Sequence, residues 1–302
     1  MNLETLDLFC DVARRGRFAA VAGDRGVDPS SISRAIALME RELGVRLFYR
    51  TTRSMRLTEA GERFHRHAQA ILSRWDQAQD SLHTDAQTPQ GQVRVTCSVA
   101  YAERVLMPLL HALQTAYPGL TIDLLATDAP IDLVQQGIDI ALRHGPDIDG
   151  DVIRRRLHPT TYHVVAGGEL ARDLGRLGHP GDLTTHPCLR YSQAPLRSQW
   201  RFQRRDALGE PPFDIPVTGR LSSASPLALR AAARNGQGIA LLANWLIADD
   251  LESGRLTDLL PAYQATPSDF GTAVWLVYAD RTYHPTRVRT VIDFLVERLF
   301  RP

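Results

Sequence analysis

The chain of 302 residues contains no Lys, so all 35 of its basic side chains are Arg, and 34 acidic residues leave a net charge of only +1. A nearly neutral charge argues against a histone-like or ribosomal protein that coats nucleic acid along its whole surface. The sequence has only three Cys and no Cys-x-x-Cys pair, which excludes a disulfide scaffold and a Cys-rich zinc site. It lacks a signal-peptide stretch and any run approaching the ~18 apolar residues of a membrane span, so we expect a cytoplasmic protein with no membrane partner.

Motifs of the common enzyme classes are missing too. The sequence has no Gly-x-Ser-x-Gly elbow, no Gly-rich phosphate loop ending in Lys, no His-Glu-x-x-His motif and no Gly-x-Gly-x-x-Gly motif. His65 and His67 lie two residues apart and cannot share a helix face, so a metal site there is not expected. We therefore expect no enzyme, no cofactor and no metal.

Charge is distributed unevenly along the chain. Residues 1–66 hold 12 Arg and 9 acidic side chains, a net charge of +3, whereas residues 67–302 hold 23 Arg and 25 acidic side chains, a net charge of −2. Four Arg and no acidic residue lie between Arg46 and Arg56. A small basic head on a slightly acidic body is the asymmetry expected when one module meets phosphate. The length and the 44% hydrophobic content indicate two or three globular domains.

Three short helices are expected in the head, each bounded by residues that favour helix ends. They run from Asn2 to Gly16, from Phe18 to Asp24 with an end near Gly26, and from Asp28-Pro29 to Glu42 with an end at Gly44. In the third helix Ile32, Ile36 and Met39 recur at helical spacing, so this face packs inward. The opposite face presents short Ser hydroxyls and one Arg, which suit base edges in a DNA major groove. The alternative is a surface helix that uses Ser for capping.

A basic hairpin follows these helices. Leu47–Arg50 and Met55–Thr58 alternate like two strands joined by the polar turn Thr51–Ser54. Arg50 and Arg53 flank this turn, where they can straddle a phosphate backbone or enter a minor groove. Three helices and a basic wing predict a winged helix-turn-helix.

The segment from Ser30 to Gly61 closely resembles the DNA-binding head of LysR-type transcriptional regulators. The resemblance is carried by the pair Ser33-Arg34, the run LGVRLF at 43–48 and the run LTEAG at 57–61. It implies a DNA-binding domain over residues 1–58, with Pro29–Arg41 as the recognition helix and Arg50–Arg56 as the wing. Our candidate DNA-binding residues are Pro29, Ser30, Ser31, Ser33, Arg34, Arg50, Thr52 and Arg53.

Three positions depart from the family pattern. Arg25 stands where a buried Leu is usual, and Arg17 stands where a Ser cap is usual. Asp28 stands where many relatives have Gln or Ser, and because a carboxylate cannot read adenine as Gln does, we assign Asp28 to helix capping.

A long helix is expected to follow the wing, over residues 59–87. An apolar seam repeats at steps of four and three residues: Phe64, Ala68, Ile71, Trp75, Ala78 and Leu82. This seam fits a partner helix, and the resemblance implies a dimerisation helix; the alternative is a helix packed on its own domain. Two heads could then read half-sites in successive major grooves. Residues 88–91 are expected to end the helix as a hinge.

Strands and helices alternate beyond residue 92, which predicts an α/β body. Strands at 93–99, 121–128 and 138–145, with a helix at 131–136, indicate a largely parallel, doubly wound sheet. A late strand at 273–279 and a helix at 288–300 can return to the first half. We therefore expect a regulatory domain over 92–302, with lobe I at about 92–161 and 268–302 and lobe II at about 162–267.

The resemblance extends over the whole chain and implies a two-lobed effector domain like a periplasmic binding protein, with a small molecule between the lobes. Candidate effector-binding residues are Ser98, Ala100, Tyr101, Asp128, His144, Ser192, Arg197, Ser223 and Asn244. Two expected helix N-termini, together with Arg143 and Arg197, favour an anionic or strongly polar effector, and an aromatic one is also considered. The alternative is that these Arg residues pair with Asp128 or Asp147.

The sequence therefore predicts a sequence-specific DNA-binding transcriptional regulator that a small-molecule effector controls. We expect a homodimer or tetramer on double-stranded promoter DNA, with RNA polymerase as a further candidate partner. The alternatives are a solute-binding domain with a non-specific DNA-binding head and, disfavoured by the missing nucleophile motif, a hydrolase. Cys97 near the cleft has only Cys188 as a resolving partner in the body, which disfavours redox sensing.

Overall fold

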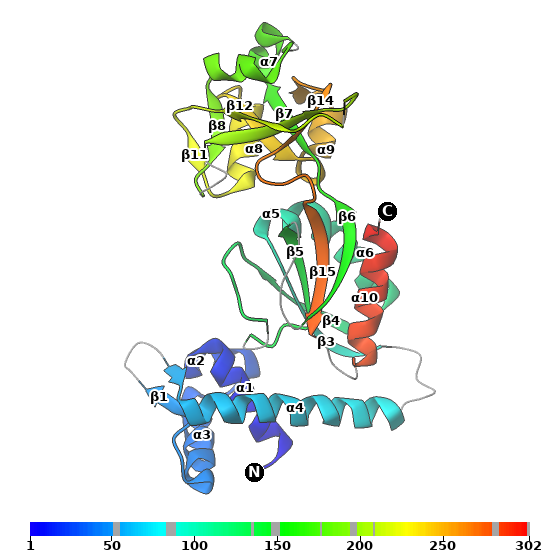
Figure 1. The fold of residues 1–302 in the computed structure, drawn as a ribbon. Coiled ribbons are helices and arrows are strands. Elements are labelled where there is room, and N and C mark those ends of the chain that lie inside the picture. The colour runs from blue at the N-terminus through cyan, green and yellow to red at the C-terminus, as the bar shows by residue number, and fades with distance from the viewer. Residues whose placement is uncertain are drawn as a thin grey trace. The chain divides into compact units, whose positions relative to one another are not determined.

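The computed structural model describes residues 1–50, 55–82, 89–133, 136–145, 152–175, 177–193, 198–207, 209–279 and 284–300. The chain forms two compact units, and each is treated by itself (Figure 1). The first is built mainly from residues 1–91 and the second mainly from residues 92–302.

The first unit contains the expected helices and hairpin. They are α1 (Leu3–Arg15), α2 (Phe18–Arg25), α3 (Pro29–Leu43), the antiparallel strands β1 (Phe48–Arg50) and β2 (Met55–Leu57), and α4 (Glu59–Leu82). Asn2 caps α1 by accepting a hydrogen bond from the Thr5 N–H at 2.9 Å, and Asp28 caps α3 in the same way. The three-helix and hairpin predictions for the head are confirmed.

The core of the head gathers side chains from all four helices and the hairpin. Phe9 is fully buried, with ring centroids 5.3 Å from Phe48 and 5.1 Å from Phe64. Burial of each such large apolar side chain stabilises the domain by about 1.5–3 kcal/mol. Ala68 is also fully buried in this core. The first half of α4 therefore packs on its own head. Phe64 and Ala68 belong to this core, so the prediction that they contact a partner helix is wrong.

The LTEAG run joins the wing to α4 by three specific contacts. The Thr58 hydroxyl accepts a hydrogen bond from the Gly61 N–H at 2.9 Å, which makes Thr58 the N-cap of α4, and it donates to the Arg46 carbonyl at 2.7 Å. A Cβ at Gly61 would lie 2.1 Å from the Leu47 carbonyl oxygen. Only Gly allows the helix to approach the start of the wing this closely.

The second unit has two sheets, and the first forms lobe I. Its strand order is β4-β3-β5-β15-β6, with β3 parallel to β5 and β15 antiparallel to both β5 and β6. The elements are β3 (Gly91–Cys97), α5 (Val99–Tyr101), the π-helix η1 (Ala102–Leu106), α6 (Met107–Ala116), β4 (Leu120–Ala126), β5 (Ile140–Gly145), β6 (Val152–Pro159), β15 (Ala273–Ala279) and α10 (Thr286–Leu299). The late strand and closing helix are where the sequence placed them.

The prediction of a largely parallel sheet is wrong. The sheet is mixed, because β15 enters from lobe II and runs opposite to its neighbours β5 and β6. The helix expected at 131–136 falls partly outside the described residues, because positions 134 and 135 are not described. The Gln136 N–H donates to the Asp132 carbonyl, and the Ile138 N–H donates to the Leu133 carbonyl.

Lobe II contains the second sheet, ordered β10-β9-β14-β7-β12-β8-β11, with β13 also paired to β7. Its strands are β7 (Tyr162–Gly167), β8 (Cys188–Tyr191), β9 (Gln199–Arg204), β10 (Phe213–Pro216), β11 (Ser222–Ser223), β12 (Ile239–Ala243), β13 (Leu256–Asp258) and β14 (Tyr263–Thr266). Its helices are α7 (Gly168–Leu174), the 3₁₀-helix η2 (Pro180–Thr185), α8 (Pro226–Arg234) and α9 (Asn244–Glu252). The buried Trp200, Phe202 and Ile239 belong to its core.

The chain crosses between the two sheets twice, and hydrogen bonds tie the crossings together. The Thr160 N–H on the first crossing donates to the Thr272 carbonyl on the second at 2.9 Å. The Asn244 backbone N–H donates to the Thr161 carbonyl at 2.8 Å, and the Asn244 side chain accepts from the Thr161 N–H at 3.3 Å. Asn244 therefore anchors α9 to the first crossing.

The close contact at Gly61 gives a matched pair of substitutions. We expect Gly61→Ala to lower the free energy of unfolding of the head by about 1–3 kcal/mol, because the new methyl group meets backbone. Gly23→Ala is the control, since nothing lies within 4 Å of the added Cβ within helix α2. That substitution should be neutral or stabilise the head by about 0.5–1 kcal/mol. Urea unfolding of the full chain, followed by circular dichroism, measures both; equal midpoints for Gly61→Ala and wild type would contradict the contact.

Candidate functional site

The outward face of α3 carries the residues expected to read DNA. Ser30, Arg34, Ala37 and Arg41 are exposed. The Arg34 guanidinium makes only long contacts, at 3.3 Å and 3.4 Å, with the carbonyl and hydroxyl oxygens of Ser30. It forms no ion pair within the described part of the chain, so its donors can turn to a nucleic acid.

Asp28 and Ser31 serve the start of this helix. The Asp28 carboxylate accepts a hydrogen bond from the Ser30 N–H at 2.7 Å, and hydrogen bonding to Ser30 holds the pKa of Asp28 below its usual value. The Ser31 hydroxyl donates to the Asp28 carbonyl at 2.5 Å. The assignment of Asp28 to helix capping agrees with this geometry. The predicted DNA contact of Ser31 requires that its hydroxyl give up the hydrogen bond to the Asp28 carbonyl.

Glu40 connects α3 to the wing, a role that sequence reasoning missed. One carboxylate oxygen of Glu40 accepts hydrogen bonds from the backbone N–H groups of Leu47 at 2.8 Å and Phe48 at 3.1 Å. On the same wing Tyr49 is 64% exposed and lies opposite Arg56 in the strand register. The glutamate thus fixes where the wing begins relative to the recognition helix.

Three of the predicted wing contacts cannot be located. Thr52 and Arg53 lie outside the described residues, and of Arg50 only the backbone, in β1, is described. Their assignment to DNA stays a prediction.

The two departures in α2 are accommodated at the surface. Arg25 forms ion pairs with Asp7 and Asp11 of α1, so it joins the two helices. Arg17 occupies the N-cap position of α2 without a side-chain capping bond.

The second half of α4 presents an unpacked apolar face. Ile71 is 46% exposed and Trp75 is 48% exposed, and Ala78 is exposed one turn further on. Leu82 is the last residue of the helix, and its side chain is not among those that the structure describes. Of the predicted dimer seam, only the residues beyond Ala68 therefore remain available to a partner helix.

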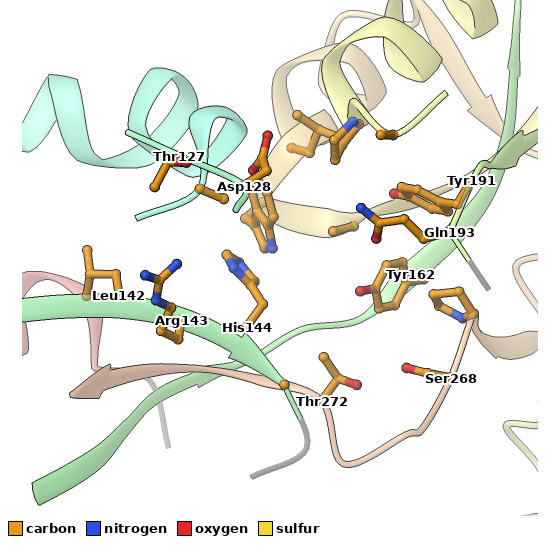
Figure 2. A pocket seen from close by; sticks show the side chains of 18 residues that line it. Thr127, Asp128, Leu142, Arg143, His144, Tyr162, Tyr191, Gln193, Ser268 and Thr272 are labelled. Atoms are coloured by element: carbon orange, nitrogen blue, oxygen red, sulfur yellow. The ribbon is translucent and has the colours of Figure 1, made fainter. Parts of the chain in front are cut away.

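A cavity of about 450 Å³ lies between lobe I and lobe II of the second unit. Its wall consists of Ser98, Thr127, Asp128, Leu142, Arg143, His144, Gly145, Tyr162, Tyr191, Gln193, Ala224, Pro226, Ala243, Trp245, Leu246, Pro267, Ser268 and Thr272. Figure 2 shows Arg143 and His144 from one side of the cavity facing Tyr162, Tyr191 and Gln193 on the other. The volume is in the range of sites for small ligands.

Arg143, on β5, is the cationic side chain of the described wall. Burial lowers the pKa of Arg143, with the nearby Cys97 opposing that shift. Arg143 has neither a hydrogen bond nor an ion pair within the described residues, and Asp128 instead accepts a hydrogen bond from the Val99 N–H at 3.2 Å. The alternative pairing of Arg143 with Asp128 is therefore not formed, while Asp147 lies outside the described residues. A partly desolvated, unpaired guanidinium favours binding of an anion.

An aromatic cluster forms the floor beside Arg143. The His144 ring centroid lies 4.9 Å from Trp245 and 5.1 Å from Tyr101. Burial lowers the pKa of His144 to about 4, with His158 and Arg143 adding to the effect, so His144 is neutral near pH 7. Nε2 of His144 and Nε1 of Trp245 are buried without a hydrogen-bond partner.

The structure brings three predicted effector residues, Ser98, Asp128 and His144, to the cavity wall, while five others are not among the residues that line it. Ala100 is buried in the core. Tyr101 is buried too, and its hydroxyl is hydrogen-bonded to His158 Nε2 at 3.0 Å. Asn244 is held by the crossing at Thr161. The Ser192 N–H donates to the Ser223 carbonyl, and the Ser223 hydroxyl accepts from the Ser225 N–H. These bonds join the segment after β8 to the segment before α8. Arg197 lies outside the described residues.

Sequence reasoning missed most of the lobe II wall. Tyr162, Tyr191, Gln193 and Trp245 come from β7, the end of β8 and the start of α9, and burial raises the pKa of Tyr162 to about 12. Tyr191 and Gln193 are the two neighbours of the predicted Ser192. The prediction therefore missed these two wall residues by one position at the end of β8. The signal available in the sequence was a Tyr at the start of one strand, β7, and a Tyr at the end of another, β8.

The cysteines of the body are poor nucleophiles. Burial raises the pKa of Cys97 to about 12, and burial also raises that of Cys188 to about 12. They lie on β3 of lobe I and β8 of lobe II, respectively. Because the thiolate is the reactive form, this argues against a redox pair.

Two kinds of feature are absent from the described segments. No helix in them has the length and apolar character to cross a membrane. They also contain no group of three or more His, Cys, Asp or Glu side chains that could hold a metal ion.

Comparison with known proteins places both units. Residues 3–62 match the bacterial regulatory helix-turn-helix protein, lysR family, and residues 86–300 match the LysR substrate binding domain. The HTH-type transcriptional regulator DmlR of Escherichia coli (strain K12) is 38% identical over 97% of this chain and 93% of that protein. The probable HTH-type transcriptional regulator LtrA of Klebsiella pneumoniae is 32% identical over 98% of this chain and 96% of that protein. The structure of CrgA, a LysR-type transcriptional regulator from Neisseria meningitidis, covers 99% of both chains with a TM-score of 0.62 and 29% identity.

The chain therefore belongs to the LysR-type transcriptional regulator family. It is a DNA-binding transcriptional regulator with an effector-binding regulatory domain, and the predictions of fold class, family, function and non-enzymatic character are confirmed. Its partners are promoter DNA and a small-molecule effector.

Proposed function

We propose that α3 reads base edges in the major groove chiefly through Arg34, supported by Ser30 and Ser33, while Arg50, Thr52 and Arg53 of the wing contact the DNA backbone. The observation that carries this proposal is the exposed, unpaired guanidinium of Arg34 on a helix whose start is capped by Asp28. Arg can pair with guanine through two hydrogen bonds, which gives specificity as well as affinity. Because promoter DNA is the target, we expect the protein to work in the cytoplasm.

Two substitutions separate base reading from backbone contact. Arg34→Ala should cost roughly 1–3 kcal/mol on a specific site and relax the preference at one base position. Arg53→Ala should weaken all sequences about equally and reduce the salt slope of binding by about 0.9, because one phosphate contact is lost. Binding titrations on specific and random DNA at several salt concentrations measure both. Equal losses on specific and random DNA for Arg34→Ala would favour the alternative, a solute-binding domain with a non-specific DNA-binding head.

We further propose that the exposed face of α4, made by Ile71, Trp75 and Ala78, joins two copies of the chain. An apolar face of this size on a helix surface is costly in water and would be covered by the same face of a second copy. Two heads joined in this way can occupy two half-sites on one side of the DNA. A dimer of dimers and a contact with RNA polymerase remain further proposals.

A charge introduced into this face tests the dimer. Ile71→Asp in the full chain should reduce the sedimenting mass toward that of one chain, because a carboxylate would be buried against apolar side chains. Ala70→Asp introduces the same side chain at a neighbouring exposed position of α4 and should leave the mass unchanged. An unchanged mass for Ile71→Asp would reject the seam.

We also propose that the effector is a small anion bound in the inter-lobe cavity by Arg143. The support is the unpaired guanidinium on the cavity wall and the neutral hydrogen-bonding groups of His144 and Trp245 beside it. The effector would bind both lobes at once, and the resulting shift between two domain geometries would alter how the heads meet DNA.

A further inference from the structure

The described wall of the cavity carries one acidic and one basic side chain, Asp128 and Arg143. Both belong to lobe I, since Asp128 follows β4 and Arg143 lies on β5. They form no ion pair with each other, although pairing would be the expected arrangement if their role were structural. The site therefore offers two separate charges to whatever fills it.

Each of these two side chains retains capacity for a ligand. The Asp128 carboxylate accepts one described hydrogen bond, from the Val99 N–H at 3.2 Å, and a carboxylate can accept several. The Arg143 guanidinium has all of its donors unused within the described residues. An anion alone would satisfy Arg143 and be repelled by Asp128, whereas a molecule with one anionic and one donating group would satisfy both.

The opposite wall is neutral and largely aromatic. Tyr162, Tyr191 and Gln193 of lobe II face the charged side in Figure 2, and burial keeps both phenols protonated by raising the pKa of each. Trp245, also of lobe II, and His144 add two buried nitrogen atoms without partners. A ligand with a flat or apolar body and one further polar atom would fill this side.

We propose, extending the anionic effector above, that the ligand is a small carboxylic acid that also carries a hydrogen-bond donor, either an ammonium or a hydroxyl group. Its carboxylate binds Arg143, its donor binds Asp128, and its body lies against Tyr162, Tyr191 and Trp245. The two charged side chains of lobe I thus determine the polar end of the ligand, and lobe II determines its body.

Two matched series of compounds test the proposal by calorimetry on the full-length protein. The aromatic series is 3-phenylpropionate, phenethylamine, phenylalanine and 3-phenyllactate; the aliphatic series is propionate, ethylamine, alanine and lactate. Within at least one series, a compound with both groups should bind at least tenfold more tightly than the simple acid, and the simple amine should bind most weakly. The comparison of ammonium with hydroxyl identifies which donor Asp128 prefers.

Substitutions assign the two groups to their side chains. Asp128→Asn should bring the affinity of the two-group compound within about twofold of that of the simple acid, and the simple acid should bind at least as tightly as it does to wild type, because the repulsion from Asp128 is removed. Arg143→Gln should weaken every carboxylate at least tenfold. Asp173→Asn removes an exposed carboxylate on α7, away from the cavity wall, and should change nothing.

The outcomes separate this inference from the proposed function. If simple acids bind as tightly as two-group compounds and only Arg143→Gln weakens them, the anionic effector stands and the role of Asp128 is overturned. If no carboxylate of either series binds, or if Arg143→Gln leaves binding unchanged, both proposals are overturned.

Discussion

The hydrogen bonds from two backbone N–H groups to the Glu40 carboxylate set the geometry of the DNA-binding head. They fix the start of β1 against α3 at 2.8 Å and 3.1 Å. From that point the wing turns back so that Thr58 can cap α4 and Gly61 can lie against the Leu47 carbonyl. The recognition helix, the described strands of the wing and the linker helix are therefore joined by direct contacts, and these contacts position Arg34 relative to the wing. A base-reading guanidinium requires such positioning because bidentate pairing tolerates little misalignment.

In the regulatory unit, α9 has a comparable role because it contacts both lobes. Its first residue, Asn244, is bonded to the crossing at Thr161, and Trp245 packs on His144 of lobe I. Further along, Asp249 pairs with Arg104 of the π-helix η1 at 2.5 Å. The next residue, Asp250, is fully buried, and Arg230 and Arg255 of lobe II hold its pKa below the usual value against the cost of burial. A ligand that touches Trp245 therefore contacts a helix that is bonded to both lobes.

The head could be predicted from sequence almost residue by residue, because capping residues, Gly stops and a single apolar stripe are local signals. The body could be predicted only in outline. Strand positions such as 273–279 were readable, but the direction of β15 depends on a return from lobe II that no local pattern encodes. The same limit applies to the cavity: Tyr101 and Asn244 lie in helices that follow β3 and β12, where a binding residue is expected, yet they are hydrogen-bonded to His158 and Thr161. Likewise Ala68 fits a dimer seam by spacing, and only packing shows that its own head buries it.

In a chain without Lys, Arg residues serve in structural ion pairs as well as at candidate ligand sites, and Arg25, Arg104 and Arg230, for example, are paired with carboxylates. Arg34 on the head and Arg143 in the cavity are not, and the account assigns DNA to the first and effector to the second. Nuclease footprinting of the intergenic region beside the protein's own gene, with and without the tightest-binding carboxylate, tests this directly in wild type and Arg143→Gln. The account predicts that the ligand changes the protected region in wild type and leaves it unchanged in Arg143→Gln. A footprint indifferent to the ligand in wild type, or an equal change in both proteins, would contradict it.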